Sequence, residues 1–424
     1  MNTSRKIVSK DIYHGLPTFP DDVTDLTAIV CGANGISGVH MLRVLAENPT
    51  RWSKIYALSR RPPTGEWPSH IQHVAMDFLT SPDQLADQVQ RQNIKADYVF
   101  FFAYIQPKPE VEGQIWSAVD ELVRTNTGLL DNFLQALALA KALPKTFLLQ
   151  LGAKYYGVHN GPTATPQEES DPRVLLEPNF YYRQEDSLKE FARDNGFNWI
   201  TTRPSWIPGA AQDAAMNLCL PLGIYAAVQK SMGRALEYPA DLTAWETQQA
   251  MSSAQMNGYL SEWCVLTPGA QNDSFNASDD CAFTWSKFWP RLAAKFDIPW
   301  KGPDVDGERS EFREVSTPYR PPPRGYGSPG VMRFKFTLVE WAKRPEVQKE
   351  WKKLASDHGL RNQDLWDVER VFGFADAGLQ QSWPNNYSSS KAKKLGFFGF
   401  VDSNESMLRV LDEFADLKML PRYS

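Results

Sequence analysis

Short, mainly apolar segments alternate with helical stretches through the first half of the chain. The pattern predicts strands at about residues 27–30, 54–59, 71–76, 98–103, 147–151 and 199–203. Apolar residues three or four positions apart predict helices at about 39–48, 115–143 and 179–195. The continuous apolar run at 98–103 is typical of a parallel strand buried on both faces. This alternation predicts an α/β fold with a Rossmann doubly wound parallel sheet.

The pattern becomes less regular after residue 205. We expect an N-terminal arm at 1–26, a Rossmann domain at 27–205, and mainly a smaller C-terminal domain at 206–424. Residues 302–331 are rich in proline, glycine and charge, so a surface loop or linker is expected there. Three consecutive prolines at 321–323 argue against a helix interior or a central strand, because proline fixes φ and lacks an N–H donor.

Composition and charge narrow the classes of function. Hydrophobic residues make up 42% and charged residues 22%, and a net charge of −5 without a basic block argues against nucleic-acid binding. No apolar run reaches about 18 residues and the N-terminus is not signal-like, so we expect no membrane span and a cytoplasmic protein. The four cysteines form no CxxC pair or Cys/His cluster, so no metal site is expected. The oligomeric state stays open, a homodimer included.

A glycine-rich turn follows the first strand of the expected Rossmann domain. Gly32, Gly35 and Gly38 form a GxxGxxG pattern between this strand and the first helix. The first glycine allows a tight turn, the second lets a pyrophosphate approach the backbone, and the third lets the helix pack closely on the sheet. Free N–H groups at the helix N-terminus favour the anion. In this context the pattern predicts a dinucleotide site, which also includes Asn34 and Ile36.

The end of the second strand indicates which dinucleotide binds. Ser59, Arg60 and Arg61 stand where an acidic residue would bind the ribose 2′-OH of NAD. Guanidinium groups there suit the 2′-phosphate of NADP, so NADPH/NADP is the expected cofactor, with a solvated basic turn as the alternative. Asp77 and Phe78, after the third strand, are expected near the adenine ring. The other expected cofactor contacts are Ala103, Tyr104, Pro204 and Ile207.

Two further motifs carry candidate chemistry. Gly152-Ala153-Lys154-Tyr155-Tyr156 follows the fifth strand, and Asn179-Phe180-Tyr181-Tyr182-Arg183-Gln184-Glu185-Asp186 opens the next helix. They resemble the GxKxY and NFYYxxED motifs of the progesterone 5β-reductase and iridoid synthase family, an atypical branch of the short-chain dehydrogenases. The resemblance spans about residues 27–421. It continues at Arg203-Pro204, Met216-Asn217-Leu218, Ile224-Tyr225-Ala226-Ala227, Phe275-Asn276, Phe283–Trp289 and Gly396–Phe400.

The resemblance implies a Rossmann domain followed by a smaller substrate domain. It also implies an NADPH-dependent 1,4-reduction of an activated C=C, in an enone or enal that is a bulky apolar small molecule of secondary metabolism. Tyr181 and Lys154 are then the catalytic pair. A phenol aimed at the carbonyl oxygen stabilises the developing enolate, and a nearby ammonium adds positive potential. For Tyr182 we expect a packing role.

Some positions depart from the family pattern. Ala103-Tyr104 stands where the family has Thr-Trp, so Tyr104 is expected to line the nicotinamide side of the pocket. The other expected substrate-pocket residues are Tyr155, Met216, Phe372 and Phe374. The 14 tryptophans and 23 phenylalanines fit either an apolar aromatic pocket or a large core. These departures favour a substrate other than a plant steroid or a monoterpene dialdehyde.

Two other functions remain open at this point. In the first, the protein is a non-redox isomerase or cyclase in which NADP(H) is structural, and Tyr181 and Lys154 polarise a carbonyl. In the second, it is a nucleotide-sensing binding protein without catalysis. The retained Tyr181 and Lys154 argue against the second, whereas the sequence does not separate the first from a reductase.

Overall fold

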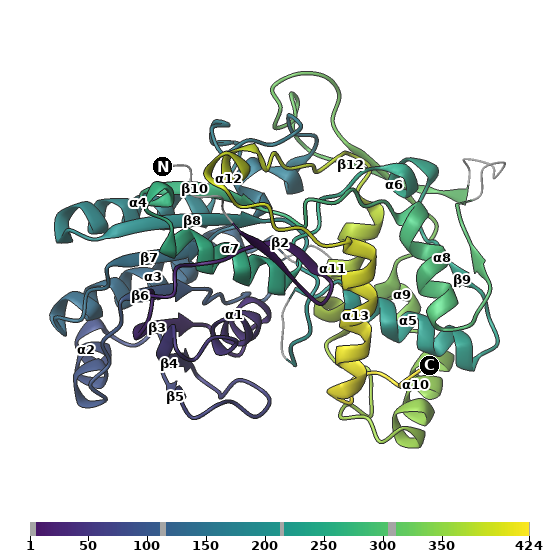
Figure 1. The fold of residues 1–424 in the computed structure, drawn as a ribbon. Helices are drawn as coiled ribbons and strands as arrows, with labels where there is room; N and C mark the ends of the chain where they lie inside the picture. Colours follow the sequence, from purple (N-terminus) through teal and green to yellow (C-terminus); the bar gives the residue numbers. More distant parts are fainter. Residues whose placement is uncertain (1–5, 111–115, 213–215, 304–310, 424) are drawn as a thin grey trace.

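A parallel sheet forms the centre of the part of the molecule shown on the left in Figure 1. The computed structural model describes residues 6–110, 116–212, 216–303 and 311–423. The sheet has seven strands in the order β10-β8-β7-β6-β3-β4-β5, and all neighbouring strands are parallel. Along the chain the strands are β3 (Leu26–Cys31), β4 (Trp52–Ser59), β5 (Ile71–Ala75), β6 (Tyr98–Phe101), β7 (Thr146–Gln150), β8 (Asn198–Pro204) and β10 (Asp273–Ala277).

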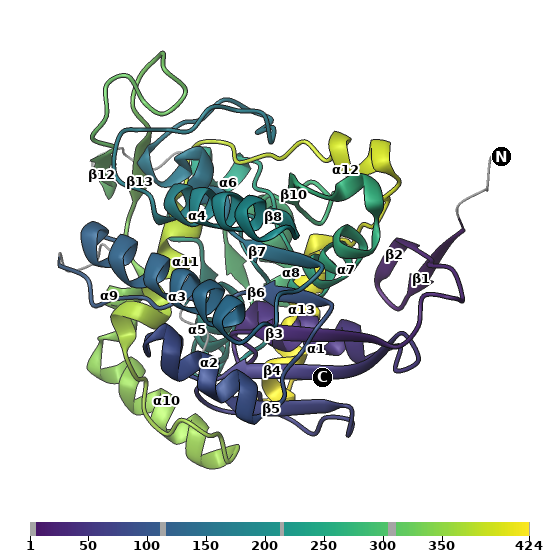
Figure 2. The same ribbon diagram turned by 90° about the vertical axis from the view of Figure 1, so that its left-hand side faces the viewer.

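Helices cover both faces of the sheet (Figure 2). On one face lie α2 (Pro82–Arg91), α3 (Val119–Leu139) and α4 (Phe180–Asn195), and on the other lie α1 (Ile36–Ala46) and α7 (Ala254–Leu266). Alternate residues of β3 belong to separate cores, because successive strand side chains point to opposite faces: Ile29 packs in one core and Val30 in the other. This arrangement confirms the predicted doubly wound α/β fold. The expected start of the long helix near Ile115 falls outside the described residues.

The last strand of the sheet comes from the second half of the chain. Residues Asp273–Ala277 of β10 pair with Ile200–Pro204 of β8, and α7 packs against α1. The domain boundary expected at residue 205 assigned no strand of this sheet to the second half of the chain. The β10 sequence, DSFNA, is mostly polar, so its hydrophobic pattern does not mark it as a strand.

A second, mainly helical layer comes from the second half of the chain and lies to the right of the sheet in Figure 1. Trp285, Trp289 and Trp351 are fully buried in its core. Much of the aromatic content therefore lies in the hydrophobic core. Its helices are α5 (Cys219–Ser231), α6 (Leu242–Glu246), α8 (Trp285–Lys295), α9 (Leu338–Ala342), α10 (Pro345–Asp357), α11 (Val368–Gln380) and α13 (Ser403–Asp416). The short helix α12 (Ser390–Leu395) lies near β10.

Two segments expected to be irregular contain paired strands. The N-terminal arm forms an antiparallel hairpin of β1 (Ile7–Lys10) and β2 (Tyr13–Pro17). In the proline-rich segment, β12 (Arg313–Ser316) pairs antiparallel with β13 (Val331–Phe334). The prolines themselves lie in the connection between these strands. That connection packs on the sheet domain, because the N–H of Arg324 donates to the carbonyl of Pro162 over 3.1 Å.

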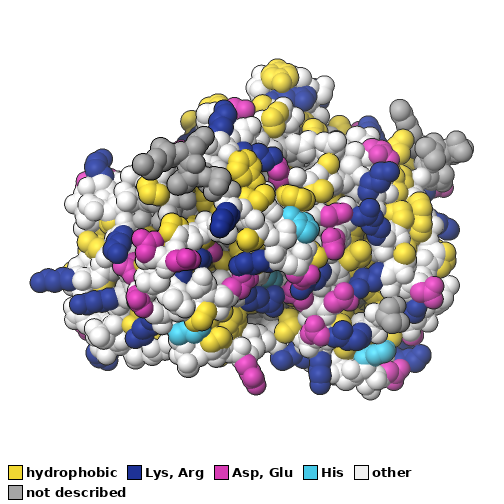
Figure 3. All heavy atoms as spheres, in the orientation of Figure 1, with side chains coloured by type: hydrophobic (Ala, Val, Ile, Leu, Met, Phe, Trp, Pro, Cys, Tyr) yellow, Lys and Arg dark blue, Asp and Glu magenta, His cyan; other side chains and the backbone are white. Residues whose placement is uncertain are grey.

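Basic and acidic side chains are intermixed over the face drawn in Figure 3. Over the described ranges, none of the helices is long and apolar enough to cross a membrane. The same ranges contain no group of three or more His, Cys, Asp or Glu side chains that could hold a metal ion.

Candidate active site

One large cavity opens where the carboxyl ends of β3 and β6 separate. Strand order reverses between these two strands, and such a switch point is where open α/β sheets bind ligands. The cavity has a volume of about 440 Å³ and runs from the glycine-rich turn at Gly32 to the aromatic side chains of the helical layer. This size suits the reactive end of a cofactor together with a small molecule.

The glycine-rich turn leaves room for backbone only. Gly32 has φ +76°, and a Cβ on it would lie 2.9 Å from the backbone nitrogen of Ala103 at the end of β6. A Cβ on Gly38 would lie 2.2 Å from the carbonyl oxygen of Gly32. The N-cap of α1 is Gly35, which has no side chain to cap the helix, and Asn34 and Ile36 line the cavity beside it. The turn therefore has the shape and the free helix end that a pyrophosphate needs.

Two arginines stand at the far end of the same cavity. Arg60 and Arg61 follow β4, are exposed, and line the cavity. Ser59 lies behind them instead of lining the cavity: its buried hydroxyl donates to the carbonyl of Arg61 over 2.7 Å and so fixes the turn. The two guanidinium groups are placed to bind a phosphate next to the pyrophosphate site.

Asp77 and Phe78, expected near the adenine ring, do not line the cavity. The carboxylate of Asp77 accepts the N–H of Leu79 over 3.0 Å and stabilises its own turn. The ring of Phe78 packs in the core, 5.0 Å from the ring centroid of Phe133 and 5.7 Å from that of Phe101. An aromatic side chain at a strand end can turn either toward a ligand or toward the sheet core, and the ring of Phe78 turns toward the core.

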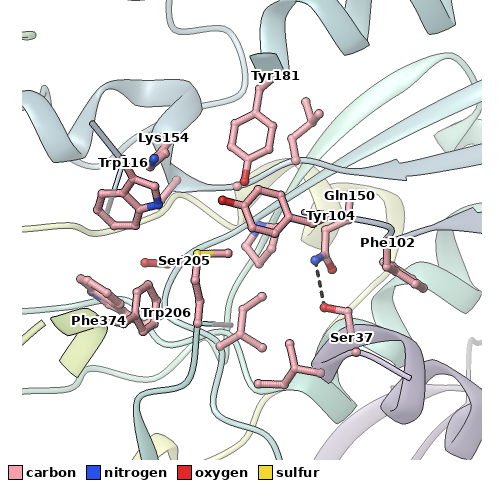
Figure 4. A pocket seen from close by; sticks show the side chains of 18 of the residues that line it. Ser37, Phe102, Tyr104, Trp116, Gln150, Lys154, Tyr181, Ser205, Trp206 and Phe374 are labelled. Carbon is pink, nitrogen blue, oxygen red and sulfur yellow. Dashed lines mark hydrogen bonds between the residues drawn. The ribbon is translucent and has the colours of Figure 1, made fainter. Parts of the chain in front are cut away.

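Tyr181 and Lys154 project into the cavity from neighbouring elements (Figure 4). Tyr181 lies in the first turn of α4, and Lys154 lies in the 3₁₀ turn η1 (Ala153–Tyr156) that follows β7. A Cβ on Gly152 would lie 2.7 Å from the Tyr181 hydroxyl, so the glycine of the GxKxY motif makes room for this phenol. Burial raises the pKa of Tyr181, which therefore remains a protonated donor.

The side chain of Asn179 joins the two elements. Its Oδ1 accepts the N–H of Tyr181 over 3.0 Å and caps α4. Its Nδ2 donates to the carbonyl of Lys154 over 2.8 Å. One amide thus sets the distance between the start of α4 and η1, which gives the asparagine of NFYYxxED a mechanical role.

The acidic end of that motif anchors α4 in the sheet domain. The buried carboxylate of Glu185 accepts from Arg173 over 2.6 Å and from Arg203 over 3.3 Å. Arg173 also pairs with Asp186. Because Arg203 is almost fully buried on β8, these contacts fix the helix that carries Tyr181.

Lys154 is half-buried and makes no ion pair within the described part of the chain. Its ammonium lies 3.7 Å from the ring centroid of Trp116, as a cation–π contact. Burial lowers the pKa of Lys154 well below the ordinary lysine value, and the charge of Glu177 opposes this only in part. Glu177 itself accepts from Nε2 of His159, another cavity residue, over 2.5 Å.

The substrate end of the cavity is aromatic. Phe374 lies 5.0 Å from Trp206 and 6.2 Å from Trp116, centroid to centroid. Met216 lines this end, as expected. Sequence reasoning did not single out Trp116, Trp206, Trp383 or His159. Of these only Trp206 had a signal, since it lies two positions after the Arg203-Pro204 segment that resembles the family.

Phe372 and Tyr155 were expected in the substrate pocket but do not line the cavity. Phe372 and Phe374 both belong to α11, where two positions differ by about 200° around the helix axis, so they face opposite sides. Phe374 lines the cavity, and Phe372 is fully buried against Trp341. The hydroxyl of Tyr155 donates to Glu185 over 3.1 Å, away from the cavity, and its ring packs on Tyr182.

The remaining expected contacts lie on the cavity wall: Gly35, Ala103, Tyr104, Pro204 and Ile207. Between the glycine turn and Tyr181, Gln150 donates to the hydroxyl of Ser37 over 2.9 Å (Figure 4). Tyr182 has the packing place expected of it, and its hydroxyl donates to the carbonyl of Tyr155 over 2.6 Å. The structure thus brings the glycine turn, the arginines, Tyr181 and Lys154 to one cavity.

Comparison with known proteins gives this cavity a family context. The profile of the PRISE-like Rossmann-fold domain matches residues 28–319. The chain belongs to the PRISE-like Rossmann-fold family. This confirms the resemblance to progesterone 5β-reductases and iridoid synthases that the motifs indicated, and it makes the chain an enzyme of the oxidoreductase type.

Relatives of this PRISE-like chain match it over almost its whole length at 27% identity. They include a short chain dehydrogenase from Penicillium aethiopicum, covering 93% of this chain and 99% of the relative. A 3-oxo-Δ(4,5)-steroid 5β-reductase from Arabidopsis thaliana covers 95% of each. An (S)-8-oxocitronellyl enol synthase from Nepeta cataria covers 93% of each. Among solved structures, UDP-glucose 4-epimerase from Thermotoga maritima shares the fold, with 14% identity, a TM-score of 0.57, and coverage of 92% of this chain and 99% of that one.

Proposed function

We propose that this PRISE-like protein is an NADPH-dependent reductase of an activated C=C, an enone or enal, in a bulky apolar small molecule of secondary metabolism. The observation that carries the proposal is the convergence in one cavity of the glycine turn, Arg60 and Arg61, the Tyr181 phenol, and an aromatic wall. The name of the steroid 5β-reductase relative describes the same type of bond, a C=C conjugated with a 3-oxo group.

The residues around Tyr181 suit this chemistry. NADPH, when bound, supplies a hydride to the β-carbon of the substrate. The C=C electron pair then moves toward the carbonyl, and negative charge develops on the carbonyl oxygen. Tyr181 donates a hydrogen bond to that oxygen, and the Lys154 charge stabilises it at longer range. A proton added at the α-carbon completes the reduction. The aromatic wall excludes water and holds the apolar body of the substrate.

The arginines should set the cofactor preference. We expect NADPH to bind at least about tenfold more tightly than NADH, about 1.4 kcal/mol, through contacts of Arg60 and Arg61 with the 2′-phosphate. Replacing both arginines with Ala should remove this preference and leave NADH binding nearly unchanged. Calorimetric titration of both cofactors with both proteins measures it. Equal affinities in the wild type would contradict the assignment.

Lys154 should make the reaction rate fall at alkaline pH. If the Lys154 ammonium stabilises the enolate, the rate is complete below the pKa of this group and falls as pH rises through it. Because burial lowers that pKa, the fall should begin below the ordinary lysine value of about 10.4. Lys154→Arg keeps the positive charge at all accessible pH, so any residual activity should not fall at alkaline pH. A pH profile of kcat for both proteins tests the assignment, and the same alkaline fall of kcat in Lys154→Arg as in the wild type would refute it.

The Asn179 amide offers a matched pair of variants. Asn179→Ser keeps an oxygen that caps α4 but removes the donor to the Lys154 carbonyl, and Asn179→Ala removes both. The Ser variant should keep nearly full stability yet lose roughly tenfold in kcat, because a small misplacement of catalytic groups is costly. The Ala variant should in addition lose about 1 kcal/mol of unfolding free energy. Urea unfolding and steady-state rates separate the two effects, and wild-type kcat in the Ser variant would deny Asn179 this role.

The function itself is tested by following NADPH absorbance while small enones and enals are supplied to the purified protein. We expect NADPH to be consumed and the C=C to be reduced. If a broad panel consumes no NADPH, while a native substrate is converted equally well with NADP in its place, the protein is a non-redox isomerase or cyclase instead.

A further inference from the structure

A second phenol faces the same part of the cavity as Tyr181. Tyr104 follows β6 and lines the cavity, and in Figure 4 the hydroxyl ends of Tyr104 and Tyr181 point toward one another from different walls. The ring of Phe180 packs against both tyrosine rings, with centroid distances of 5.9 Å to Tyr104 and 4.3 Å to Tyr181. The structure therefore presents two hydroxyl groups to the same part of one cavity.

The hydroxyl of Tyr104 has a close, uncharged hydrogen-bond partner in its own segment. It donates to Oε1 of Gln106 over 2.5 Å, and Nε2 of Gln106 donates to the carbonyl of Pro107 over 3.1 Å, which fixes the amide orientation. Burial raises the pKa of Tyr104 well above its ordinary value, which favours the neutral, donating form of the phenol. A hydroxyl proton turns about its C–O bond without moving the ring.

We propose that Tyr104 is a further catalytic residue, a second hydrogen-bond donor to the substrate oxygen that Tyr181 also contacts. The inference rests on the proposed reductase function. As hydride adds to the β-carbon, the C=C electron pair moves to the bond between the α-carbon and the carbonyl carbon, and the C=O pair moves onto oxygen. Both phenols keep their protons. Only the direction of the Tyr104 O–H changes, from Gln106 to the enolate oxygen.

The timing of this change decides what Tyr104 contributes. A hydrogen bond to a charged oxygen is shorter and stronger than one to a neutral amide, so the exchange is favourable only once charge has developed. An interaction gained in the transition state and absent in the ground state raises kcat and leaves substrate binding unchanged. This behaviour separates a donor from a residue that only shapes the pocket.

Tyr104→Phe deletes one oxygen atom and keeps the ring. We expect kcat for enone reduction to fall about tenfold, less than the loss of a full donor, because the Gln106 bond is given up in exchange. The KM of the enone and the affinity for NADPH should stay within about twofold. Tyr326→Phe is the matched control, since Tyr326 is an exposed phenol of the proline-rich segment, and it should behave as wild type. Unchanged kcat in Tyr104→Phe, or an equal loss of kcat and NADPH affinity, overturns the inference.

A binding measurement gives a readout independent of turnover. Substituted phenols of increasing acidity, titrated into the protein saturated with NADP, present an oxyanion like that of the enolate. Wild-type affinity should rise with phenol acidity, and Tyr104→Phe should flatten that rise and weaken the most acidic phenol about tenfold. Identical series for wild type and Tyr104→Phe would overturn the inference. If no enone consumes NADPH, the reductase proposal fails by itself and this titration alone decides the role of Tyr104.

Discussion

Tyr181→Phe should lower kcat for enone reduction by about 10²–10³-fold, the usual loss when one oxyanion donor is removed. The variant retains the ring, which packs at 4.3 Å from Phe180, so the cavity should keep its shape. Affinity for NADPH should change little, because the arginines and the glycine turn lie at the other end of the cavity. Rates from NADPH absorbance and affinities from calorimetry measure the two quantities.

Lys154→Ala should lower kcat comparably, and the double variant should lose little more than either single one, since the two residues act as a unit on one developing charge. Tyr182→Phe is the control for the motif: its hydroxyl is used within the structure, so it should affect stability more than kcat. A Tyr181→Phe enzyme with wild-type kcat would remove the phenol from the reaction.

Gly38→Ala should weaken NADPH binding by at least about 100-fold, about 2.7 kcal/mol. The added Cβ would lie 2.2 Å from the carbonyl oxygen of Gly32 and 2.7 Å from Cα of Ala33, so the phosphate-binding turn has to move. Overpacking of this kind also costs about 1–3 kcal/mol of stability, partly offset by the better helix propensity of alanine.

Gly128→Ala is the matched control for this substitution. Gly128 lies inside α3, and a Cβ there would meet no atom within 4 Å. The control should keep NADPH affinity and gain about 0.5–1 kcal/mol of stability. Calorimetry and thermal unfolding test both proteins, and wild-type NADPH affinity in Gly38→Ala would mean that the turn does not hold the cofactor.

Local patterns predicted much of the site because its parts lie directly after strands. The glycine turn follows β3, the arginines follow β4, and Lys154 follows β7, so finding the strand also finds the residue. Parallel strands end at one edge of a sheet, which brings these segments together without further information. Tyr181 was identified through a motif resemblance, and the structure adds why Asn179 precedes it by two positions.

The parts that the sequence did not reveal depend on tertiary contacts. Whether Phe372 or Phe374 faces the cavity depends on the phase of α11, which the pattern around it does not determine. Trp116 and Trp383 lie outside regular elements and reach the cavity only because distant segments fold over it. The β10 strand is too polar to be recognised from its pattern, and it is a strand because β8 offers an edge with which it pairs.

The central claim is that a hydride is transferred to the β-carbon of the substrate. Labelling that hydride with deuterium and locating the deuterium in the product tests this most directly. The enzyme is given an enone and NADPH deuterated at the transferable C4 position, and the product is analysed by NMR. The account predicts one deuterium at the β-carbon, a solvent proton at the α-carbon, and an intact carbonyl. Deuterium on the former carbonyl carbon, or a converted product without deuterium, would contradict it.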